Sequence, residues 1–534
     1  MREKLQRHGA FALALLMVLA VCLLFAQRKN GMFIDEIYTY GLSNSHYAPF
    51  LKDVAGGELE GAVLTRQELL DYVTVGEDEI GDFGSVYDNQ VNDVHPPLYY
   101  WLFHLVSCLT PGVFSKWTGL GLDLILYLLS LFALYRLVLR LFGSPWNAAA
   151  AVLLYGLSGL GLSTMLMIRM YVLMTALTVQ LALLVVLQMK RPRRLWPPLI
   201  GLTIFLGLMT QYYFVFYAFF LCAFYVFWAA GKKRWKDLGL FALFALAGAA
   251  LLLLCFPACL NQLLAATDPT VEKLGHDSNL RENLLNFSRH GPLLERMTRH
   301  LRLKGLRAAR LASYPLLLLL LPCLPRLRTA VGKRPLSVGP WLTVLVPALL
   351  VYPLVTVISP VPSVRYLYNI IPILVLLPCL LLHLLERSLE GLPRPLLWKS
   401  AALALLLVLG LWEARTYPPQ DYLYPEHSAY NALLDEHAEA PCVYLTGHFE
   451  PLTQDLIQLL RFDEVYITED PAAPALKERT AGARECVVFI DTSAYWSSGF
   501  DPQVMLPALM EETGFTGVQP LYSYELSETY LLTK

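Results

Sequence analysis

Two adjacent carboxylates, Asp35 and Glu36, follow the first long apolar stretch of the chain, in "GMFIDEIYTYGLS". Neighbouring side chains point in different directions on a helix or a strand, so these two cannot face each other as an acid and base pair. One of them can face a cavity while the other bonds the scaffold or a ligand. An ordinary solvated loop would also account for the pair. Both are candidate catalytic residues.

A second polar group precedes an aromatic stretch in "DNQVNDVHPPLYYWL". Asp93 and His95 stand just before Pro96 and Pro97, which fix the backbone, and Tyr99 belongs to an aromatic set typical of a membrane interface. Asp93 and His95 can bind a metal ion or position a phosphate, and a helix cap is the alternative for Asp93. Asp93, His95 and Tyr99 are therefore candidate substrate-binding residues.

Two arginines lie in apolar surroundings. Arg169 in "MLMIRMYVLM" has no acidic neighbour, and Arg365 in "VPSVRYLYNIIP" is also followed by tyrosines. A charge within a membrane is costly and marks a functional candidate, and guanidinium groups match phosphate oxygens in a bidentate fork. Snorkelling to lipid headgroups is the alternative for each arginine. The candidate phosphate-binding residues are Arg169, Tyr171, Arg365 and Tyr366, and Tyr212 in "TQYYFVFY" adds a substrate-positioning rim.

The composition is that of a membrane protein. Of the 534 residues, 56% are hydrophobic and 16% are charged, and the mean hydropathy of +0.48 is far too apolar for a soluble protein of this size. The net charge of -1, without a basic domain, argues against a nucleic-acid partner. The first apolar segment is read as a retained helix rather than a cleaved signal peptide. Eleven membrane spans are predicted, at residues 10–26, 118–141, 146–163, 171–189, 195–210, 212–230, 237–258, 311–324, 341–358, 368–385 and 397–412.

Clusters of Lys and Arg between these spans predict the topology. The stretch 95–109 is short for a membrane span. If it does not cross the membrane, all the basic clusters are cytoplasmic, as the positive-inside rule requires. The N-terminus is then cytoplasmic and the C-terminus extracytoplasmic. We expect a transmembrane domain at 1–412, with an acidic external loop at 28–94 and a second external loop at 259–310. The second loop contains an amphipathic stretch that suits a membrane surface.

The tail at 413–534 predicts a small external α/β domain. The stretches "CVYLTG" and "CVVFIDT" have the apolar, β-branched composition of strands, "PLTQDLIQLLRF" has helical periodicity, and "YSYELSETYLLT" is expected to be a final strand. Cys442 and Cys486 each open a strand candidate. They are either two buried thiols or a bridge between neighbouring strands.

Four motifs in order carry a resemblance to a known family. They are "FIDEIYTYGLS", "DVHPPLYYWLFHL", "IRMYVL" and "VRYLYNIIP". The chain resembles bacterial relatives of the dolichyl-phosphate-mannose protein mannosyltransferases, in the glycosyltransferase C superfamily, which includes the aminoarabinose transferases of lipid A. The resemblance covers about the first 385 residues and leaves the tail unmatched. It implies a glycosyltransferase C-like membrane fold, an active site on the outer face and a polyprenyl-phosphate-linked sugar as donor.

The resemblance also implies roles for several residues. It places Asp35 near the acceptor, with Glu36 as its neighbour. It places Arg169 and Arg365 at the lipid phosphate, and it assigns His95 to the "HPP" element. The turn before Arg169 has no Asp or Glu, unlike that of some relatives. A second acidic site therefore stays open, as does a divalent metal ion as cofactor.

The expected reaction is one displacement that inverts the anomeric configuration. Asp35 takes the proton of the acceptor hydroxyl and the two arginines stabilise the departing phosphate, so all three must share one chamber. The expected partners are the lipid-phosphate sugar, membrane lipids and an acceptor protein, lipid or glycan. The alternatives are a lipid or polysaccharide transporter or flippase, a non-catalytic assembly or sensor protein, and a polysaccharide ligase with a diphosphate-linked donor. The sequence does not identify the sugar.

Overall fold

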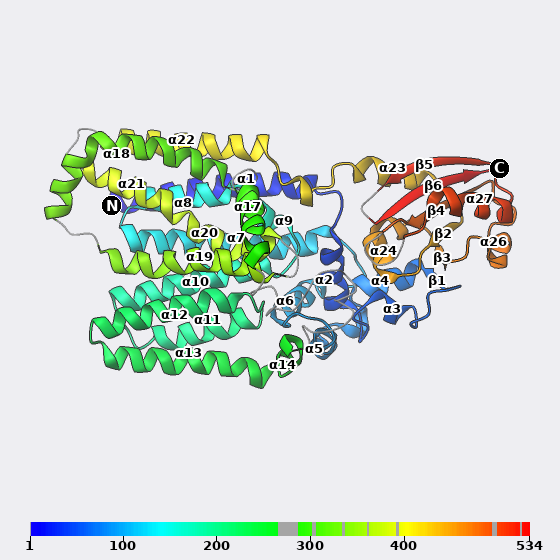
Figure 1. Ribbon diagram of the computed structural model, residues 1–534, viewed down its shortest axis with the longest axis horizontal. Coiled ribbons are helices and arrows are strands. Elements are labelled where there is room, and N and C mark those ends of the chain that lie inside the picture. The colour runs from blue at the N-terminus through cyan, green and yellow to red at the C-terminus, as the bar shows by residue number, and fades with distance from the viewer. Residues whose placement is uncertain are drawn as a thin grey trace. The chain divides into compact units, whose positions relative to one another are not determined.

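The computed structural model groups the chain into two compact units (Figure 1). The helical unit comprises the described parts of Met1–Gln27, Leu120–Thr267 and His276–Gln420, and the sheet unit comprises those of Arg28–Gly119 and Asp421–Lys534. The residues described are 2–264, 287–301, 306–333, 337–359, 363–390, 395–493, 499–523 and 526–534.

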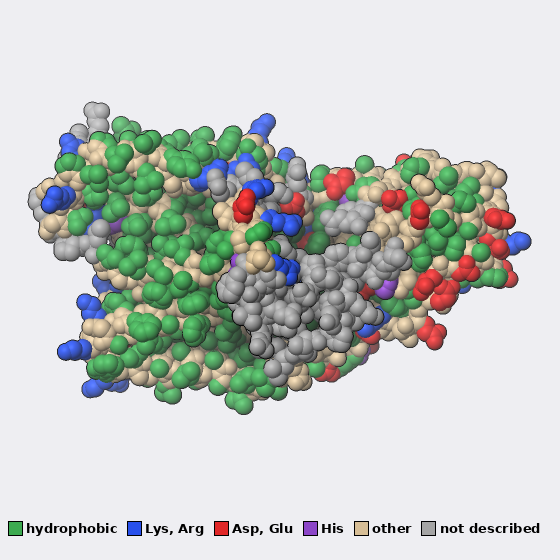
Figure 2. All heavy atoms as spheres, viewed as in Figure 1, with side chains coloured by type: hydrophobic (Ala, Val, Ile, Leu, Met, Phe, Trp, Pro, Cys, Tyr) green, Lys and Arg blue, Asp and Glu red, His purple; other side chains and the backbone are tan. Residues whose placement is uncertain are grey.

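Within the described residues, nine helical segments are long and apolar enough to cross a membrane. They confirm the prediction of a polytopic α-helical membrane protein. On the visible face of the helical unit, apolar side chains cover the helices, and Lys and Arg gather at helix ends (Figure 2). The nine are α1 (Arg2–Arg28), α7 (Lys116–Phe142), α10 (Tyr171–Lys190), α12 (Phe214–Gly231), α13 (Trp235–Cys255), α18 (Arg307–Lys333), α19 (Val338–Ile358), the segment formed by η3 (Val364–Ile370), α20 (Ile371–Leu374) and α21 (Leu376–Ser388), and α22 (Pro395–Thr416).

One predicted span is bent in the middle. The helices α8 (Pro145–Gly156) and α9 (Gly159–Leu166) meet at an angle of 65°. The bend arises at Ser158, whose backbone is extended and whose Oγ accepts a hydrogen bond from the Gly161 N–H at 3.0 Å, as an N-cap does. Each of the eleven predicted spans overlaps one of the nine segments, this bent pair, or α11.

The helix α11 (Trp196–Leu208) is a shorter apolar helix that packs closely against α13. Glycine permits this approach, because a Cβ atom on Gly248 of α13 would lie 2.1 Å from the carbonyl oxygen of Gly201. A short helix α14 (Ala258–Leu264) follows α13. The predicted external loop 259–310 lies partly outside the described residues. Its helix α17 (Phe287–His300) packs against α19, with Thr298 Oγ1 and the Tyr352 hydroxyl 2.6 Å apart.

The first part of the sheet unit consists of short helices from the predicted acidic loop. The helix α2 begins directly after Phe33, and α6 contains the "LYYWLFHL" stretch but has only 10 residues, too few to cross a bilayer. The elements are α2 (Ile34–Asn44), α3 (Leu51–Val54), β1 (Val63–Thr65), α4 (Arg66–Val73), η1 (Glu77–Glu79), α5 (Phe83–Val91) and α6 (Leu98–Ser107).

The tail forms a small α/β layer, as the sequence predicts. Its six-stranded sheet has the order β1-β3-β2-β4-β6-β5, with β2 parallel to both β3 and β4. The edge strand β1 comes from the acidic loop and pairs antiparallel with β3. The remaining elements are η4 (Gln420–Tyr422), α23 (His427–Glu436), β2 (Cys442–Leu445), α24 (Phe449–Gln454), α25 (Leu456–Leu459), β3 (Glu464–Thr468), α26 (Pro474–Arg479), β4 (Glu485–Asp491), α27 (Pro502–Thr513), β5 (Gly517–Ser523) and β6 (Ser527–Thr533).

Three details of the tail refine the sequence expectation. The predicted helix "PLTQDLIQLLRF" is interrupted at Asp455, whose buried carboxylate accepts hydrogen bonds from the Tyr444 and Ser527 hydroxyls at 2.8 and 2.5 Å. The stretch "YSYELSETYLLT" contains the end of β5 and all of β6, which pair antiparallel instead of forming one strand. Cys442 and Cys486 are both buried free thiols.

Candidate active site

The helix α2 carries both adjacent carboxylates and separates their surroundings. The Glu36 side chain is fully buried, and its Oε2 accepts hydrogen bonds from Lys29 Nζ at 2.9 Å and from the Phe33 N–H at 2.7 Å. The second bond satisfies a backbone donor at the start of α2. Lys29 is also fully buried and donates to the carbonyl of Tyr422 at 2.9 Å. Asp35, in contrast, is half-buried.

Tyr38, one turn along α2 from Asp35, lies within electrostatic reach of three carboxylates. Burial raises the pKa of the Tyr38 hydroxyl, the negative charges of Glu450 and Asp35 raise it further, and that of Asp93 adds a smaller increase. The Oδ2 atom of Asp93 also lies 2.8 Å from His95 Nδ1. Asp35 and Asp93 therefore share an electrostatic influence on one tyrosine, and His95 is held against Asp93.

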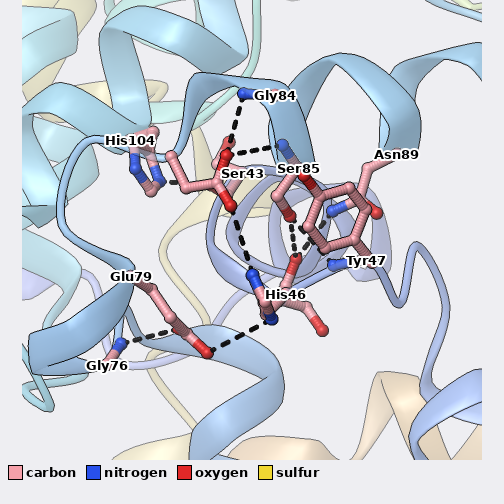
Figure 3. Close-up of polar contacts among 11 residues, drawn as sticks. Ser43, His46, Tyr47, Gly76, Glu79, Gly84, Ser85, Asn89 and His104 are labelled. Atoms are coloured by element: carbon pink, nitrogen blue, oxygen red, sulfur yellow. Dashed lines mark hydrogen bonds and ion pairs between the residues drawn. The ribbon is translucent and has the colours of Figure 1, made fainter.

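Hydrogen bonds from α5 and α6 hold the C-terminal end of α2 (Figure 3). The Asn89 side-chain amide donates to the Ser45 carbonyl at 2.8 Å, and His104 Nδ1 donates to the Ser43 carbonyl at 2.8 Å. The start of α5 is in turn capped by Asp82, whose pKa is lowered chiefly by the hydrogen bond from a backbone N–H of α5. With Lys29 and Glu36 at its beginning, α2 is thus held at both ends.

Tyr99, a predicted substrate-binding residue, belongs to a packed aromatic group. It is 0% exposed, and its ring lies 6.0 Å from that of Tyr100 and 6.3 Å from that of Phe103. Pro96 and Pro97, just before α6, are buried as well. The "HPP" element therefore ends in a rigid core that fixes the start of α6.

The helical unit brings the two arginine motifs together. Arg169 is 5% exposed and lies in the turn between α9 and α10, and Tyr171 begins α10. The Tyr171 ring lies 6.2 Å from that of Tyr366 in η3. Arg365, next to Tyr366 in the same 3-10 helix, has its guanidinium carbon 5.4 Å from the centre of the Tyr366 ring.

Two further tyrosines join this contact, and the sequence did not single them out. The Tyr368 ring lies 6.1 Å from that of Tyr171, and the Tyr213 ring lies 4.9 Å from that of Tyr366. Tyr212, the predicted neighbour, donates a hydrogen bond from its hydroxyl to Gln262 Oε1 at 2.5 Å. The run "TQYYFVFY" indicated the right stretch, but its adjacent tyrosines cannot be told apart until the start of α12 is known.

The carboxylates belong to the sheet unit and the arginines to the helical unit. Among the residues that the structure describes, no group of three or more His, Cys, Asp or Glu side chains is arranged to hold a metal ion. The two units thus differ in the kind of polar group that they contribute. The sheet unit has carboxylates within electrostatic reach of Tyr38 and an imidazole held against one of them. The helical unit has the Arg365 guanidinium beside the Tyr366 ring, and Arg169 in the turn just before Tyr171.

Comparison with protein families agrees with the resemblance carried by the motifs. Residues 94–260 match the family model described as dolichyl-phosphate-mannose-protein mannosyltransferase, which confirms the recognition over that segment. The match includes the "HPP" element and the "IRMYVL" motif, whereas Asp35 and Arg365 lie outside it. No curated protein sequence matches the chain.

One of the solved structures that align with this chain has a TM-score above 0.5 and shares its fold, and two others align with lower scores. ArnT from Cupriavidus metallidurans in the apo state aligns with a TM-score of 0.53 and 11% identity, over 99% of this chain and 98% of that one. The same enzyme bound to undecaprenyl phosphate aligns with a TM-score of 0.49 and 12% identity, over 98% of both chains. The archaeal oligosaccharyltransferase AglB from Archaeoglobus fulgidus, with an inhibitory peptide and a dolichol-phosphate, gives 0.47 and 12% identity, over 99% of this chain and 74% of that one.

Proposed function

We propose that this chain is an integral membrane glycosyltransferase that moves a sugar from a polyprenyl-phosphate donor to an acceptor hydroxyl on the outer face of the membrane. The mannosyltransferase family pattern at residues 94–260 and the fold shared with apo ArnT support this class of enzyme. The proposal includes a cytoplasmic N-terminus and an extracytoplasmic tail, because the basic clusters between the spans then all face inwards.

One observation carries the proposal: the contact between Tyr171 and Tyr366. Their rings lie 6.2 Å apart, although the two residues come from motifs that are distant in the sequence. Arg169 lies two residues before Tyr171, just ahead of α10, and Arg365 lies one residue before Tyr366, in the first turn of η3, which supports one site for both arginines. Two arginines that precede a pair of contacting tyrosines suit a phosphate attached to a long apolar chain.

The burial of Arg169 supports a role in binding the donor phosphate. Arg169 is 5% exposed, so an anion bound beside its guanidinium would be largely shielded from water, which strengthens their attraction. Arg365 is half-buried next to Tyr366, where a lipid headgroup can reach it. In our proposal these two arginines stabilise the charge that develops on the departing phosphate.

The two adjacent carboxylates take different roles in the proposal. Glu36 holds Lys29 and the backbone of Phe33, so we assign it to positioning α2. Asp35 is half-buried beside the polar group around Tyr38, and we assign it as the general base. Asp93 and His95 position the acceptor, whereas Tyr99 contributes through packing.

The chemical step is one displacement at the anomeric carbon. The acceptor oxygen forms a bond to that carbon while the bond to the phosphate oxygen breaks, and the electron pair leaves with the polyprenyl phosphate. Asp35 receives the proton of the acceptor hydroxyl. Because attack and departure occur on opposite faces of the sugar, the anomeric configuration inverts.

An Asp35→Asn variant tests this proposal. Membranes with matched expression receive labelled polyprenyl-phosphate sugar, and sugar transfer is measured. We expect the rate to fall by about 100-fold or more, since general-base catalysis contributes about that much, while donor binding is kept. Asp53→Asn is a matched control, because Asp53 is an exposed carboxylate of the same loop. Near-normal transfer by Asp35→Asn would refute the base assignment.

The same assay separates the enzyme from its rivals. A transporter or flippase moves the labelled lipid across the membrane without breaking the sugar–phosphate bond, and a non-catalytic assembly protein leaves it intact. A ligase that needs a diphosphate-linked donor leaves the monophosphate donor unused. Release of unlabelled polyprenyl phosphate together with labelled acceptor is expected from the proposed enzyme alone.

A further inference from the structure

The sheet of the tail has a polar edge where its parallel strands end. The strand β2 lies between β3 and β4, and the chain passes from β2 to β3 on one side before it reaches β4 on the other. The connection that leaves β2 and the connection that leaves β4 therefore run towards opposite edges of the sheet, and a topological switch point lies between β2 and β4. In open α/β sheets, ligands bind outside the carboxyl ends of the strands at such a point.

Hydrogen bonds give this edge a fixed shape. The Thr446 hydroxyl, just after β2, donates to Asp491 Oδ2 at the end of β4 over 3.0 Å. It also accepts from the His448 N–H at 3.0 Å. Asp491 is held further by the Ser493 N–H, which donates to its Oδ1 at 2.9 Å. We call Thr446, His448, Glu450 and Asp491 the polar edge.

Two side chains of the polar edge are accessible to a ligand. His448 and Glu450 are half-buried, whereas Asp491 is 0% exposed. Burial raises the pKa of Asp491, hydrogen bonds from the Ser493 N–H and the Thr446 hydroxyl lower it, and His448 and Glu450 have smaller electrostatic effects of opposite sign. His448 and Glu450 therefore lie within electrostatic reach of the end of β4.

The polar edge also lies close to the helix that carries the proposed base. The helix α24 packs against α2, and the Gln454 side-chain amide lies 3.4 Å from the Met32 carbonyl oxygen. Of the charges that act on the Tyr38 hydroxyl, that of Glu450 has the largest effect and that of Asp35 the next. Because Glu450 lies on α24, which packs against α2, the polar edge and the surroundings of Asp35 are neighbours inside one compact unit.

We propose that His448 and Glu450 bind the acceptor, and that the acceptor is a hydroxyl-rich group without negative charge, such as a neutral or amino-sugar glycan. This inference rests on the proposed function, which supplies the donor and the base. Carboxylate and imidazole groups form hydrogen bonds with sugar hydroxyls, and Tyr38 adds an aromatic face. The negative charges of Asp35, Asp93 and Glu450 disfavour an anionic acceptor at the same place.

Binding of small sugar probes tests the inference without any sugar transfer. The full-length protein in lipid nanodiscs is examined by saturation-transfer NMR with methyl glucoside, glucosamine and glucose 6-phosphate as uncharged, cationic and anionic probes. We expect glucose 6-phosphate to bind worst of the three, because the carboxylates repel an anion, and we take methyl glucoside as the reference probe. Glu450→Gln and His448→Gln should each weaken its binding by about fivefold to tenfold, the usual effect of losing a hydrogen bond to a charged group.

Two further variants serve as a control and as a test of the charge of the site. Glu478→Gln changes an exposed carboxylate of α26 and should leave all three probes unaffected. Glu450→Lys should gain binding of glucose 6-phosphate. The inference is overturned if both polar-edge variants match Glu478→Gln, or if glucose 6-phosphate binds best to the unmodified protein.

A second measurement separates this inference from the proposed function. Binding of undecaprenyl phosphate to the same samples is measured by native mass spectrometry. We expect the polar-edge variants to bind this lipid as the unmodified protein does, which also shows that they are folded. If the unmodified protein does not bind the lipid phosphate, the proposed donor is wrong even where the sugar probes behave as expected.

Discussion

Lys29 and Glu36 form a fully buried ion pair, with 2.9 Å between Lys29 Nζ and Glu36 Oε2. The same carboxylate oxygen also accepts from the Phe33 N–H, so a single atom joins the segment before α2 to the first turn of that helix. Asp35 is the preceding residue and is half-buried. The ion pair therefore fixes the orientation of α2 and, with it, the direction in which Asp35 extends.

Removal of one partner of this pair should destabilise the sheet unit. We expect Lys29→Met or Glu36→Gln to cost about 3–5 kcal/mol, because the remaining charge or dipole stays buried without compensation. The double variant should regain part of this loss. Thermal unfolding of the purified protein in detergent gives the comparison. Glu464→Gln removes an exposed partner of Arg479 and should change stability by about 1 kcal/mol at most. Equal losses in the buried and exposed pairs would contradict this account.

The two arginines should differ from other basic residues in their effect on donor use. We expect Arg169→Ala and Arg365→Ala each to raise the donor KM by about tenfold or more, and the Lys variants to recover only part, since lysine cannot form the bidentate fork. Sugar transfer at varied donor concentration measures this. Arg193→Ala, at an exposed position, serves as control. Unchanged donor dependence in both Ala variants would remove the phosphate assignment.

Tyr213 should matter more for donor use than Tyr212. The Tyr213 ring lies 4.9 Å from that of Tyr366, whereas the Tyr212 hydroxyl bonds to Gln262. We expect Tyr213→Ala to raise the donor KM by about fivefold, in line with the loss of one aromatic contact of roughly 1 kcal/mol, and Tyr212→Ala to have a smaller effect. Sugar transfer at varied donor concentration again gives the comparison. The reverse order would indicate that the substrate lies on the Gln262 side.

The sequence predicted the elements that are long and strongly apolar. Each predicted span has a counterpart, because about twenty apolar residues are a strong signal for a membrane helix. The bend at Ser158 was not predicted, since a single serine in an apolar run gives no sign that its side chain caps a new helix. The strand Val63–Thr65 was not predicted either, because it depends on pairing with β3, which lies far along the chain.

The candidate site was predictable in residue type and less so in residue role. One member of the "DE" pair was expected to bond the scaffold. Which member does so depends on Lys29, which in the sequence resembles any basic residue at the end of the first span. Tyr99 looks like an interface tyrosine in the sequence and is 0% exposed in the fold. Burial of an aromatic side chain is set by tertiary packing, which a single sequence does not reveal.

Acid should destabilise the sheet unit through His104. This residue is 2% exposed, and burial lowers its pKa from 6.5. The hydrogen bond to Ser43 and the charges of Asp82 and Glu79 raise the pKa, but burial has the larger effect. As the pH falls, the unfolded chain therefore binds this proton at a higher pH than the folded protein does. The contribution of His104 to the free energy of unfolding is complete above about pH 6.5 and is lost below it. His427 has the same sign, because burial lowers its pKa too.

The measurement is the unfolding temperature at about pH 7.5 and at about pH 5.5, on either side of the usual histidine pKa. We expect a fall on acidification that is smaller in His104→Gln, with the remainder due in part to His427. His290→Gln, at a half-buried position of α17 in the helical unit, is the control and should keep the full fall. An equal fall in His104→Gln and in the unmodified protein would show that His104 does not titrate in this range.

Glu413 should position the turn that carries Arg169. It is 0% exposed near the end of α22, and its carboxylate accepts hydrogen bonds from the backbone N–H groups of Gly159 and Arg307 at 3.2 Å each, and from that of Ala308. One side chain therefore satisfies donors at the starts of both α9 and α18. Since α9 leads directly into the turn with Arg169, displacement of α9 moves the proposed phosphate site.

Glu413→Ala leaves these donors buried without an acceptor, which should cost about 2–3 kcal/mol of stability. Glu413→Gln keeps an acceptor oxygen and should lose less. A purely structural role would lower the unfolding temperature only, whereas a positioning role should also raise the donor KM at a temperature where both variants are fully folded. Transfer assays under those conditions distinguish the two, with Glu295→Ala on the exposed face of α17 as control. A donor KM unchanged in Glu413→Ala would limit Glu413 to holding α9 and α18 together.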